Sequence, residues 1–156
     1  EPTQQIRSFG VKLKHNINKS LVNNKTLILI DDSLVRGTTS VKIIKMLYEA
    51  GAKEVHLRIA SPPIKYPDYY GVDTPNQKEL LASKLDIEGM RKFINATTLQ
   101  FLSIEGLYKS MGYEKRNSSY PQFTDHCFTG EYPVKPTDAN DKDFINEQLS
   151  LMSAKY

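Results

Sequence analysis

The chain has 156 residues, of which 39% are hydrophobic and 25% are charged, so it can form one domain with a substantial core. Its formal net charge of +3 is too small to indicate a nucleic-acid or membrane partner, and no apolar run approaches the roughly 20 residues of a membrane-spanning helix. The single cysteine, Cys127, excludes an internal disulfide and a metal site built only from cysteines. We expect a cytoplasmic protein, and because the sequence starts at Glu1 without a signal-peptide pattern, a piece of a longer chain.

The first predicted elements form a βαβ unit. The continuous apolar run Leu27–Ile30 predicts a strand that is covered on both faces. Apolar residues at helical spacing predict a helix over 41–50, and Gly51 stands where its C-terminal cap belongs. The alternation over 55–59 predicts a second strand with one more polar face, which carries His56 and Arg58. The two strands should therefore be parallel.

A proline-rich loop follows the second strand, and Thr74 then begins a capping-box pattern that predicts a helix to about Lys84. The N-terminus of such a helix would suit the phosphate of a nucleotide. Residues 114–140 look irregular. The periodicity of the remaining segments predicts three more helices and an edge strand: helices over 87–94, 105–111 and 143–152, and a strand over 98–102.

The stretch from Leu27 to Ser40 reads LILIDDSLVRGTTS and carries the clearest functional signal. Asp31 and Asp32 follow the first strand, and ligands of open parallel sheets bind beyond the carboxyl ends of the strands. Gly37 permits a tight turn near a ligand, and the next helix offers free N–H groups to a phosphate. Three hydroxyl groups add donors: Thr38, Thr39 and Ser40. Carboxylates repel a bare phosphate but suit sugar hydroxyls or Mg²⁺, so the stretch predicts a ribose-phosphate site.

Three other interpretations use the same residues. An exposed turn with two aspartates and a Ser/Thr-capped helix is common and would bind nothing. A Walker loop requires Lys after the glycine, where this chain has Thr38. A receiver domain needs a phosphate-accepting aspartate at the end of a later strand, but Ala60 is followed by Ser61 and two prolines. The simple turn therefore stays open as the alternative.

The same stretch resembles the phosphoribosyl pyrophosphate (PRPP) signature of the type I phosphoribosyltransferases. Three further segments are similar to one family among them, the amidophosphoribosyltransferases: EPTQQIRSFGVKLKHN, AGAKEVHLRIASPPIKYPDYYGVDTP and FTGEYPV. The resemblance extends to about Val134. It implies a Rossmann-like α/β fold of type I phosphoribosyltransferases, with a mostly parallel sheet, flanking helices and an incomplete N-terminal side. Residues 1–135 would be the C-terminal part of that domain, with 1–20 the end of a flexible active-site loop, and 136–156 a tail with a helix.

The resemblance also implies an activity, the transfer of ammonia from glutamine to PRPP in the first step of purine biosynthesis. Asp31 and Asp32 would hold the ribose hydroxyls and contribute to one Mg²⁺ site per PRPP. The backbone around Arg36 and Gly37 would hold the 5-phosphate. Three hydroxyl side chains would assist: Thr38, Thr39 and, less directly, Ser33. The alternative function is a PRPP-binding regulatory module without catalysis.

Partners and cofactors follow from the same resemblance. We expect a glutaminase domain in the full-length chain, purine nucleotides as feedback inhibitors and a homo-oligomer, but neither nucleic acid nor membrane. The fragment by itself is expected to be inactive. Some bacterial relatives carry an iron–sulfur cluster, but Asp68 and Thr124 stand where those relatives have cysteine, so none is expected here.

Several other conspicuous residues have a structural and a functional interpretation. His15 and His126 lack partners at the spacing of metal ligands. Three N-terminal side chains belong to an active-site lid or to solvated coil: Gln4, Gln5 and Arg7. Three tyrosines have two interpretations, a surface that binds a purine base or ordinary packing of the loop: Tyr66, Tyr69 and Tyr70.

Overall fold

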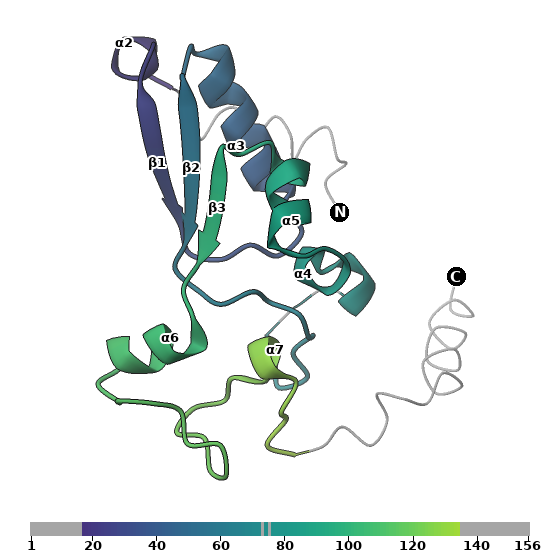
Figure 1. Cartoon of the computed structure of the whole chain (residues 1–156). Coiled ribbons are helices and arrows are strands. Elements are labelled where there is room, and N and C mark those ends of the chain that lie inside the picture. The colour runs from purple at the N-terminus through teal and green to yellow at the C-terminus, as the bar shows by residue number, and fades with distance from the viewer. Residues whose placement is uncertain (1–16, 73, 75, 135–156) are drawn as a thin grey trace, which may run out of the picture.

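A three-stranded parallel sheet organises the computed structural model, which describes residues 17–72, 74 and 76–134. The strands β1 (Thr26–Asp31), β2 (Glu54–Ile59) and β3 (Thr98–Phe101) lie in that order (Figure 1). The predicted parallel βαβ unit is therefore confirmed. β3 pairs with β2 on one side only, as predicted for an edge strand.

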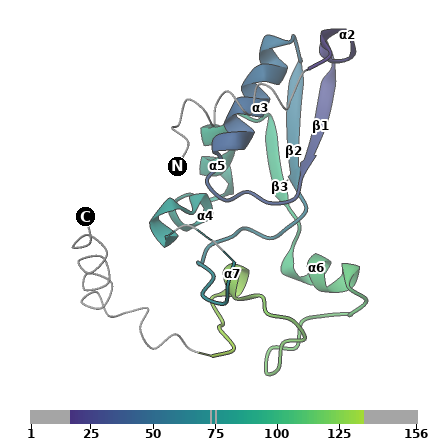
Figure 2. The ribbon, with the colours of Figure 1, turned by 180° about the vertical axis from the view of Figure 1, so that it is seen from behind.

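Two helices cover one face of this sheet. They are α3 (Thr38–Glu49), which connects β1 to β2, and α5 (Ile87–Ile94), which precedes β3, and both views place them on the same side (Figures 1 and 2). Successive side chains of a strand point to opposite faces of the sheet, so one set from each strand faces the helices. The side chains that meet between the helices and the sheet are mostly aliphatic. The buried members of this core from α3, β2, α5 and β3 include Ile44, Val55, Leu57, Ile59, Met90, Ile94 and Leu99.

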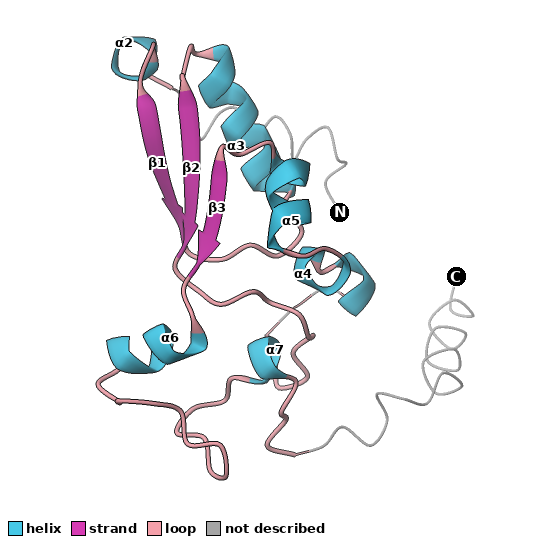
Figure 3. Cartoon of the chain, viewed as in Figure 1, coloured by secondary structure: helices cyan, strands magenta, loops and turns pink. Residues whose placement is uncertain are grey.

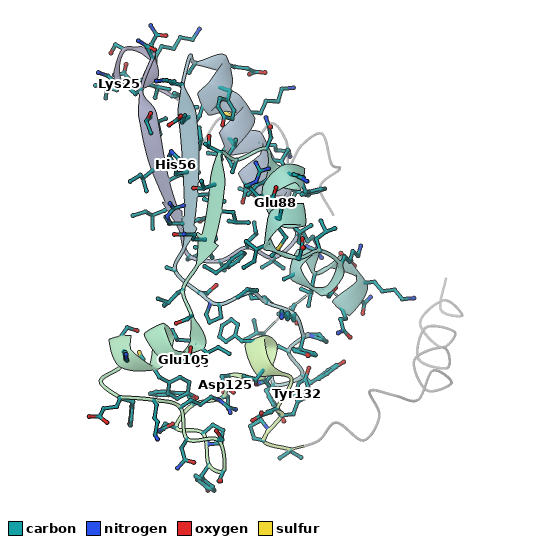
Figure 4. The ribbon with its side chains drawn as sticks, viewed as in Figure 1. Lys25, His56, Glu88, Glu105, Asp125 and Tyr132 are labelled. Atoms are coloured by element: carbon teal, nitrogen blue, oxygen red, sulfur yellow. The ribbon has the colours of Figure 1, made fainter. Side chains whose placement is uncertain are left out.

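The opposite face of the sheet is open in the described part of the chain. Ile28 and Ile30 of β1 are 68% and 73% exposed. They pair across the sheet with His56 and Arg58 of β2, which share that face (His56 is labelled in Figure 4). The prediction that β1 is covered on both faces is thus wrong for the described residues, because no described segment packs on Ile28 or Ile30.

The helix predicted from Thr74 to Lys84 is also wrong. This segment holds only a 3₁₀ turn, η1 (Gln77–Glu79), and one helical turn, α4 (Leu81–Lys84), in a long stretch of loop (Figure 3). The Thr74 hydroxyl accepts a hydrogen bond from the backbone N–H of Asp68 at 2.6 Å instead of capping a helix. The fully buried Leu80 has an extended backbone that separates η1 from α4. No helix begins at Thr74, so the predicted binding of a nucleotide phosphate at a helix N-terminus there is wrong as well.

Three shorter helices complete the described part: α2 (Lys19–Val22), α6 (Ile104–Ser110) and α7 (His126–Thr129). α6 was predicted almost to the residue, whereas α2 and α7 were not predicted. In Figure 1, α6 and α7 lie beyond the carboxyl ends of the strands. None of the described helices combines the length and the apolar character that crossing a bilayer requires. The predicted helix over 143–152, the candidate lid residues and His15 lie outside the described residues.

The irregular segment after α6 is held together by one buried carboxylate, Asp125. It accepts hydrogen bonds from the Tyr108 hydroxyl at 2.9 Å and from the guanidinium of Arg116, which also reaches Glu131. Burial alone would raise the pKa of Asp125, but the hydrogen bonds from Arg116 and Tyr108 outweigh burial and lower it. This network fixes the loop that leads into α7 (Asp125 is labelled in Figure 4).

Candidate functional site

The loop between β1 and α3 forms a pocket beyond the carboxyl end of the sheet, where the sequence predicted a ribose-phosphate site. The pocket has a volume of about 210 Å³. Six of the seven predicted site residues line it: Asp31, Ser33, Arg36, Gly37, Thr38 and Thr39. The seventh, Asp32, is exposed and does not line this pocket. The predicted residues are therefore brought together by one short loop.

The two neighbouring carboxylates occupy different environments. Asp31 is the last residue of β1, pairs with Ile59 across the sheet and is only partly exposed, whereas Asp32 is exposed. The Asp31 carboxylate accepts a hydrogen bond from the N–H of Asp32 at 3.1 Å, and the Asp32 carboxylate accepts one from the Ser33 hydroxyl at 3.0 Å. No described lysine or arginine forms an ion pair with either carboxylate. Both therefore keep oxygen lone pairs available for hydroxyl groups or for a hard cation.

Gly37 sets the position at which α3 begins. Its φ of +75° is left-handed, and no side chain caps the helix. A Cβ at Gly37 would lie 2.9 Å from Leu81 Cδ2 and 3.1 Å from Phe93 Cε1, so both the backbone conformation and the close packing require glycine. The first N–H groups of a helix have no partner within the helix. The start of α3 is thus an uncapped end of positive potential, flanked by the exposed hydroxyls of Thr38 and Thr39.

The side chain of Arg36, next to this helix end, is paired with a carboxylate from η1. Its Nε donates to Glu79 Oε2 of η1 at 2.8 Å, and the backbone N–H of Leu81 donates to the carbonyl of Val35 at 2.8 Å. These two hydrogen bonds attach the segment from η1 to α4 to the loop that lines the pocket. Sequence reasoning missed Glu79, because no local pattern links residues 43 positions apart.

A second polar cluster, at α7, was also missed. His126 Nε2 lies 2.7 Å from Asp68 Oδ2, and Cys127 Sγ lies 3.8 Å from the same oxygen. As expected, no residue near His126 in the sequence stands at the spacing of a metal ligand. The fold nevertheless brings Asp68, 58 positions away, next to His126. The rings of Tyr70 and Tyr132 pack against His126, with centroids 5.0 and 4.9 Å from its ring.

Comparison with known proteins gives a consistent picture, although no protein-family model matches the chain. The chain is 55% identical to the amidophosphoribosyltransferase of Rhizobium etli over 155 residues, which are 99% of this chain and 31% of that protein. It is 49% identical to a chloroplast amidophosphoribosyltransferase of Arabidopsis thaliana over 96% of the chain and 26% of the relative. The chain thus spans about a third or less of the length of these relatives.

Solved structures agree with the sequence comparison. The glutamine PRPP amidotransferase of Bacillus subtilis, complexed with ADP and GMP, superposes with a TM-score of 0.69 at 43% identity, over 86% of this chain and 30% of that one. A structure of the allosteric regulatory enzyme of purine biosynthesis matches with a TM-score of 0.68. The parallel sheet with its flanking helices matches the phosphoribosyltransferase-type α/β fold of these structures. In sequence and in fold, the chain is similar along most of its length to about a third of an amidophosphoribosyltransferase.

Proposed function

We propose that this chain holds PRPP for an amidophosphoribosyltransferase, which joins ammonia from glutamine to the ribose of PRPP and releases pyrophosphate. The observation that carries the proposal is the pocket at the end of β1, where two carboxylates precede the uncapped start of α3. This combination suits a sugar diol next to a phosphate better than either ligand alone. The similarity to amidophosphoribosyltransferases supports ammonia as the acceptor.

In this proposal, the ribose phosphate lies at the start of α3. Free N–H groups and the helix dipole favour an anion there, and the hydroxyls of Thr38 and Thr39 add neutral donors. The lack of a Cβ at Gly37 lets the backbone come close to the phosphate. Ser33 acts through the Asp32 carboxylate, to which its hydroxyl donates.

Asp31 and Asp32 would accept hydrogen bonds from the ribose hydroxyls and contribute oxygen ligands to one Mg²⁺ ion. Their carboxylates fit a hard cation, because they lie at one strand end and are not neutralised by a described lysine or arginine. When bound, Mg²⁺ would supply positive charge to the pyrophosphate oxygens. The side chains on this chain would orient the ribose and hold negative charge beside it.

The proposed reaction breaks the bond between the anomeric carbon and the pyrophosphate oxygen and forms a bond from that carbon to the ammonia nitrogen. Positive charge builds up on the ribose in the transition state, so a carboxylate near the ring stabilises it. Because ammonia is the nucleophile, the protein contributes positioning and electrostatics, and no covalent intermediate is required. Phosphoribosylamine and pyrophosphate are the products.

The partners of the whole enzyme belong to the same proposal. They are a glutaminase domain that supplies ammonia, purine nucleotides that inhibit, and further copies of the chain. The solved relative from Bacillus subtilis, complexed with ADP and GMP, supports a nucleotide-binding role for the family. The cytoplasm is the proposed compartment, although the plant relatives are named as chloroplast proteins.

Calorimetric titration of the full protein with PRPP and Mg²⁺ tests the proposal, together with pyrophosphate release in the presence of ammonia. The Thr38→Val variant is expected to bind PRPP more weakly. A matched control is Thr26→Val at the opposite end of β1, where the hydroxyl donates to Glu54 and lies far from the pocket along the strand. The proposal is wrong if the folded protein does not bind PRPP, or if the two variants affect binding equally.

A further inference from the structure

We propose that Asp68, His126 and Cys127 form a site for a single divalent transition-metal ion such as Zn²⁺. The three side chains offer a carboxylate oxygen, an imidazole nitrogen and a thiol sulfur that all lie within 4.8 Å of one another. Asp68 belongs to the loop after β2, whereas His126 and Cys127 belong to α7. The site would therefore join two segments that are distant in the sequence, and it does not depend on PRPP binding.

The Asp68 carboxylate is already oriented toward the other two ligands. Its Oδ1 atom accepts hydrogen bonds from the backbone N–H groups of Tyr70 at 2.7 Å and Val72 at 3.1 Å. These bonds leave Oδ2 directed at His126 Nε2 and Cys127 Sγ. Burial would raise the pKa of Asp68, but hydrogen bonds from Val72 and Tyr70 and the contact with His126 outweigh burial and lower it. A carboxylate held in this way is typical of metal ligands with supporting hydrogen bonds.

His126 contains the only fully buried side-chain nitrogen or oxygen among the described residues that lacks a hydrogen-bond partner, its Nδ1 atom. Buried polar atoms without partners are rare and call for an explanation. Without an ion, Nε2–H donates to the Asp68 carboxylate; with an ion bound between them, the ring can carry its proton on the unpartnered Nδ1 and present the Nε2 lone pair to the ion. The rings of Tyr70 and Tyr132 shield the imidazole (Tyr132 is labelled in Figure 4), and the His126 side chain is only 4% exposed.

The spacing of the three atoms requires little change to accept an ion. Bond lengths to Zn²⁺ of about 2.0 Å for nitrogen and oxygen and about 2.3 Å for sulfur give tetrahedral separations of roughly 3.3 Å for N···O and 3.5 Å for S···O. The corresponding distances here are 2.7 Å and 3.8 Å. The third pair, His126 Nε2 and Cys127 Sγ, lies within 4.8 Å, against roughly 3.5 Å around such an ion, so shifts on the order of 1 Å suffice, with a water molecule as the fourth ligand.

The chemistry of the donors selects the type of ion. A mixed nitrogen, oxygen and sulfur set suits Zn²⁺ or Co²⁺, whereas Mg²⁺ prefers oxygen ligands alone. With one cysteine in the sequence, the chain cannot supply the four thiolates that are typical of an iron–sulfur cluster. Burial raises the pKa of Cys127 to about 11, so the bound ion must displace the thiol proton, as metal ions do at coordinating thiols.

The experiment uses the full protein, freed of metal with a chelator and titrated with Co²⁺ and then Zn²⁺. We expect one Co²⁺ per chain, with a thiolate-to-cobalt charge-transfer band in the near ultraviolet and the visible bands of a tetrahedral site, and displacement by Zn²⁺. Cys127→Ser should remove the charge-transfer band. Loss of a group that only hydrogen-bonds to a metal ligand typically weakens metal binding about 10–100-fold, so His126→Asn, which removes a direct ligand, should weaken it by at least that much.

His56→Asn is the matched control, because His56 also lies beside a carboxylate, with Nε2 3.4 Å from Glu54 Oε2, but has no thiol nearby. This variant should bind Co²⁺ as the wild-type protein does. Circular dichroism of each variant shows whether it is folded. The absence of a charge-transfer band in the folded wild-type protein would overturn the proposal, as would binding that depends on His56 rather than on His126. The wild-type spectrum decides the matter even if a variant unfolds.

Discussion

Arg36 Nε donates to Glu79 Oε2 at 2.8 Å, so a charged side chain of the candidate phosphate loop is held by a carboxylate from η1. Both side chains are about half exposed, and exposed ion pairs contribute roughly 0.2–1 kcal/mol. The pair is therefore a minor contribution to stability. Its larger effect is on the pocket, because Glu79 offsets the charge of Arg36 next to the proposed phosphate position.

The first prediction concerns this pair. Glu79→Gln should free Arg36 and tighten PRPP binding by up to about fivefold, corresponding to at most about 1 kcal/mol. The gain should shrink as salt is raised, because the side chains are exposed. Calorimetric titration at two salt concentrations measures both effects. Glu88→Gln, which breaks a similar pair with Arg91 on α5, should leave PRPP binding unchanged; weaker binding by Glu79→Gln would contradict the prediction.

The second prediction concerns the exposed carboxylate. Asp32→Asn removes a charge that would face the ribose, so turnover should fall and its dependence on Mg²⁺ should change. Steady-state rates of pyrophosphate release over a range of Mg²⁺ concentrations provide the measurement. Asp86→Asn, at the start of α5, removes the same charge away from the pocket and serves as the control. A normal Mg²⁺ dependence in folded Asp32→Asn protein would favour the simple turn.

The third prediction separates phosphate binding from the metal site. Thr38→Val removes one neutral donor to a charged phosphate, and such hydrogen bonds contribute on the order of 1.5–3 kcal/mol. PRPP binding should therefore weaken by about ten- to a hundredfold. The Mg²⁺ dependence of turnover should stay near that of the wild-type enzyme, because the carboxylates are intact. A changed Mg²⁺ dependence would show that the hydroxyl contributes to the metal site.

The fourth prediction concerns the backbone at Gly37. Replacement by Ala should cost about 1–2 kcal/mol of unfolding free energy for the left-handed conformation and about 1–3 kcal/mol more for the contacts with Leu81 and Phe93. Gly112→Ala isolates the first contribution, because Gly112 also has a left-handed φ but nothing lies within 4 Å of its Cβ position. Urea unfolding of both variants gives the difference. Equal losses would mean that α4 and α5 move aside.

Local sequence patterns were sufficient for the sheet and for α3, α5 and α6. The β1 run and the alternation in β2 depend only on neighbouring residues, and Gly37 marks the start of α3 through its own backbone conformation. The pocket residues were found for the same reason, since they form one continuous stretch. Local chemistry predicted a ribose-phosphate site there, and the resemblance narrowed the expected ligand to PRPP.

Several of the failures have a different cause, which is contact between residues that no local pattern links. Thr74 matched a capping box, but its hydroxyl is used by the backbone of Asp68. Glu79 reaches Arg36, and Asp68 reaches His126, across 43 and 58 positions. The pattern of apolar and polar residues in a segment cannot predict such pairs, because each partner looks like an ordinary surface residue within its own segment.

The open face of β1 has a consequence for experiments on this chain. In the described part of the chain nothing covers Ile28 and Ile30, and exposed apolar strand surfaces of this kind favour association between copies of a protein. Association of folded molecules raises the apparent unfolding midpoint as the protein concentration increases. The Gly37 and Gly112 variants therefore need to be unfolded at one low concentration, and a midpoint that shifts on dilution would reveal such association.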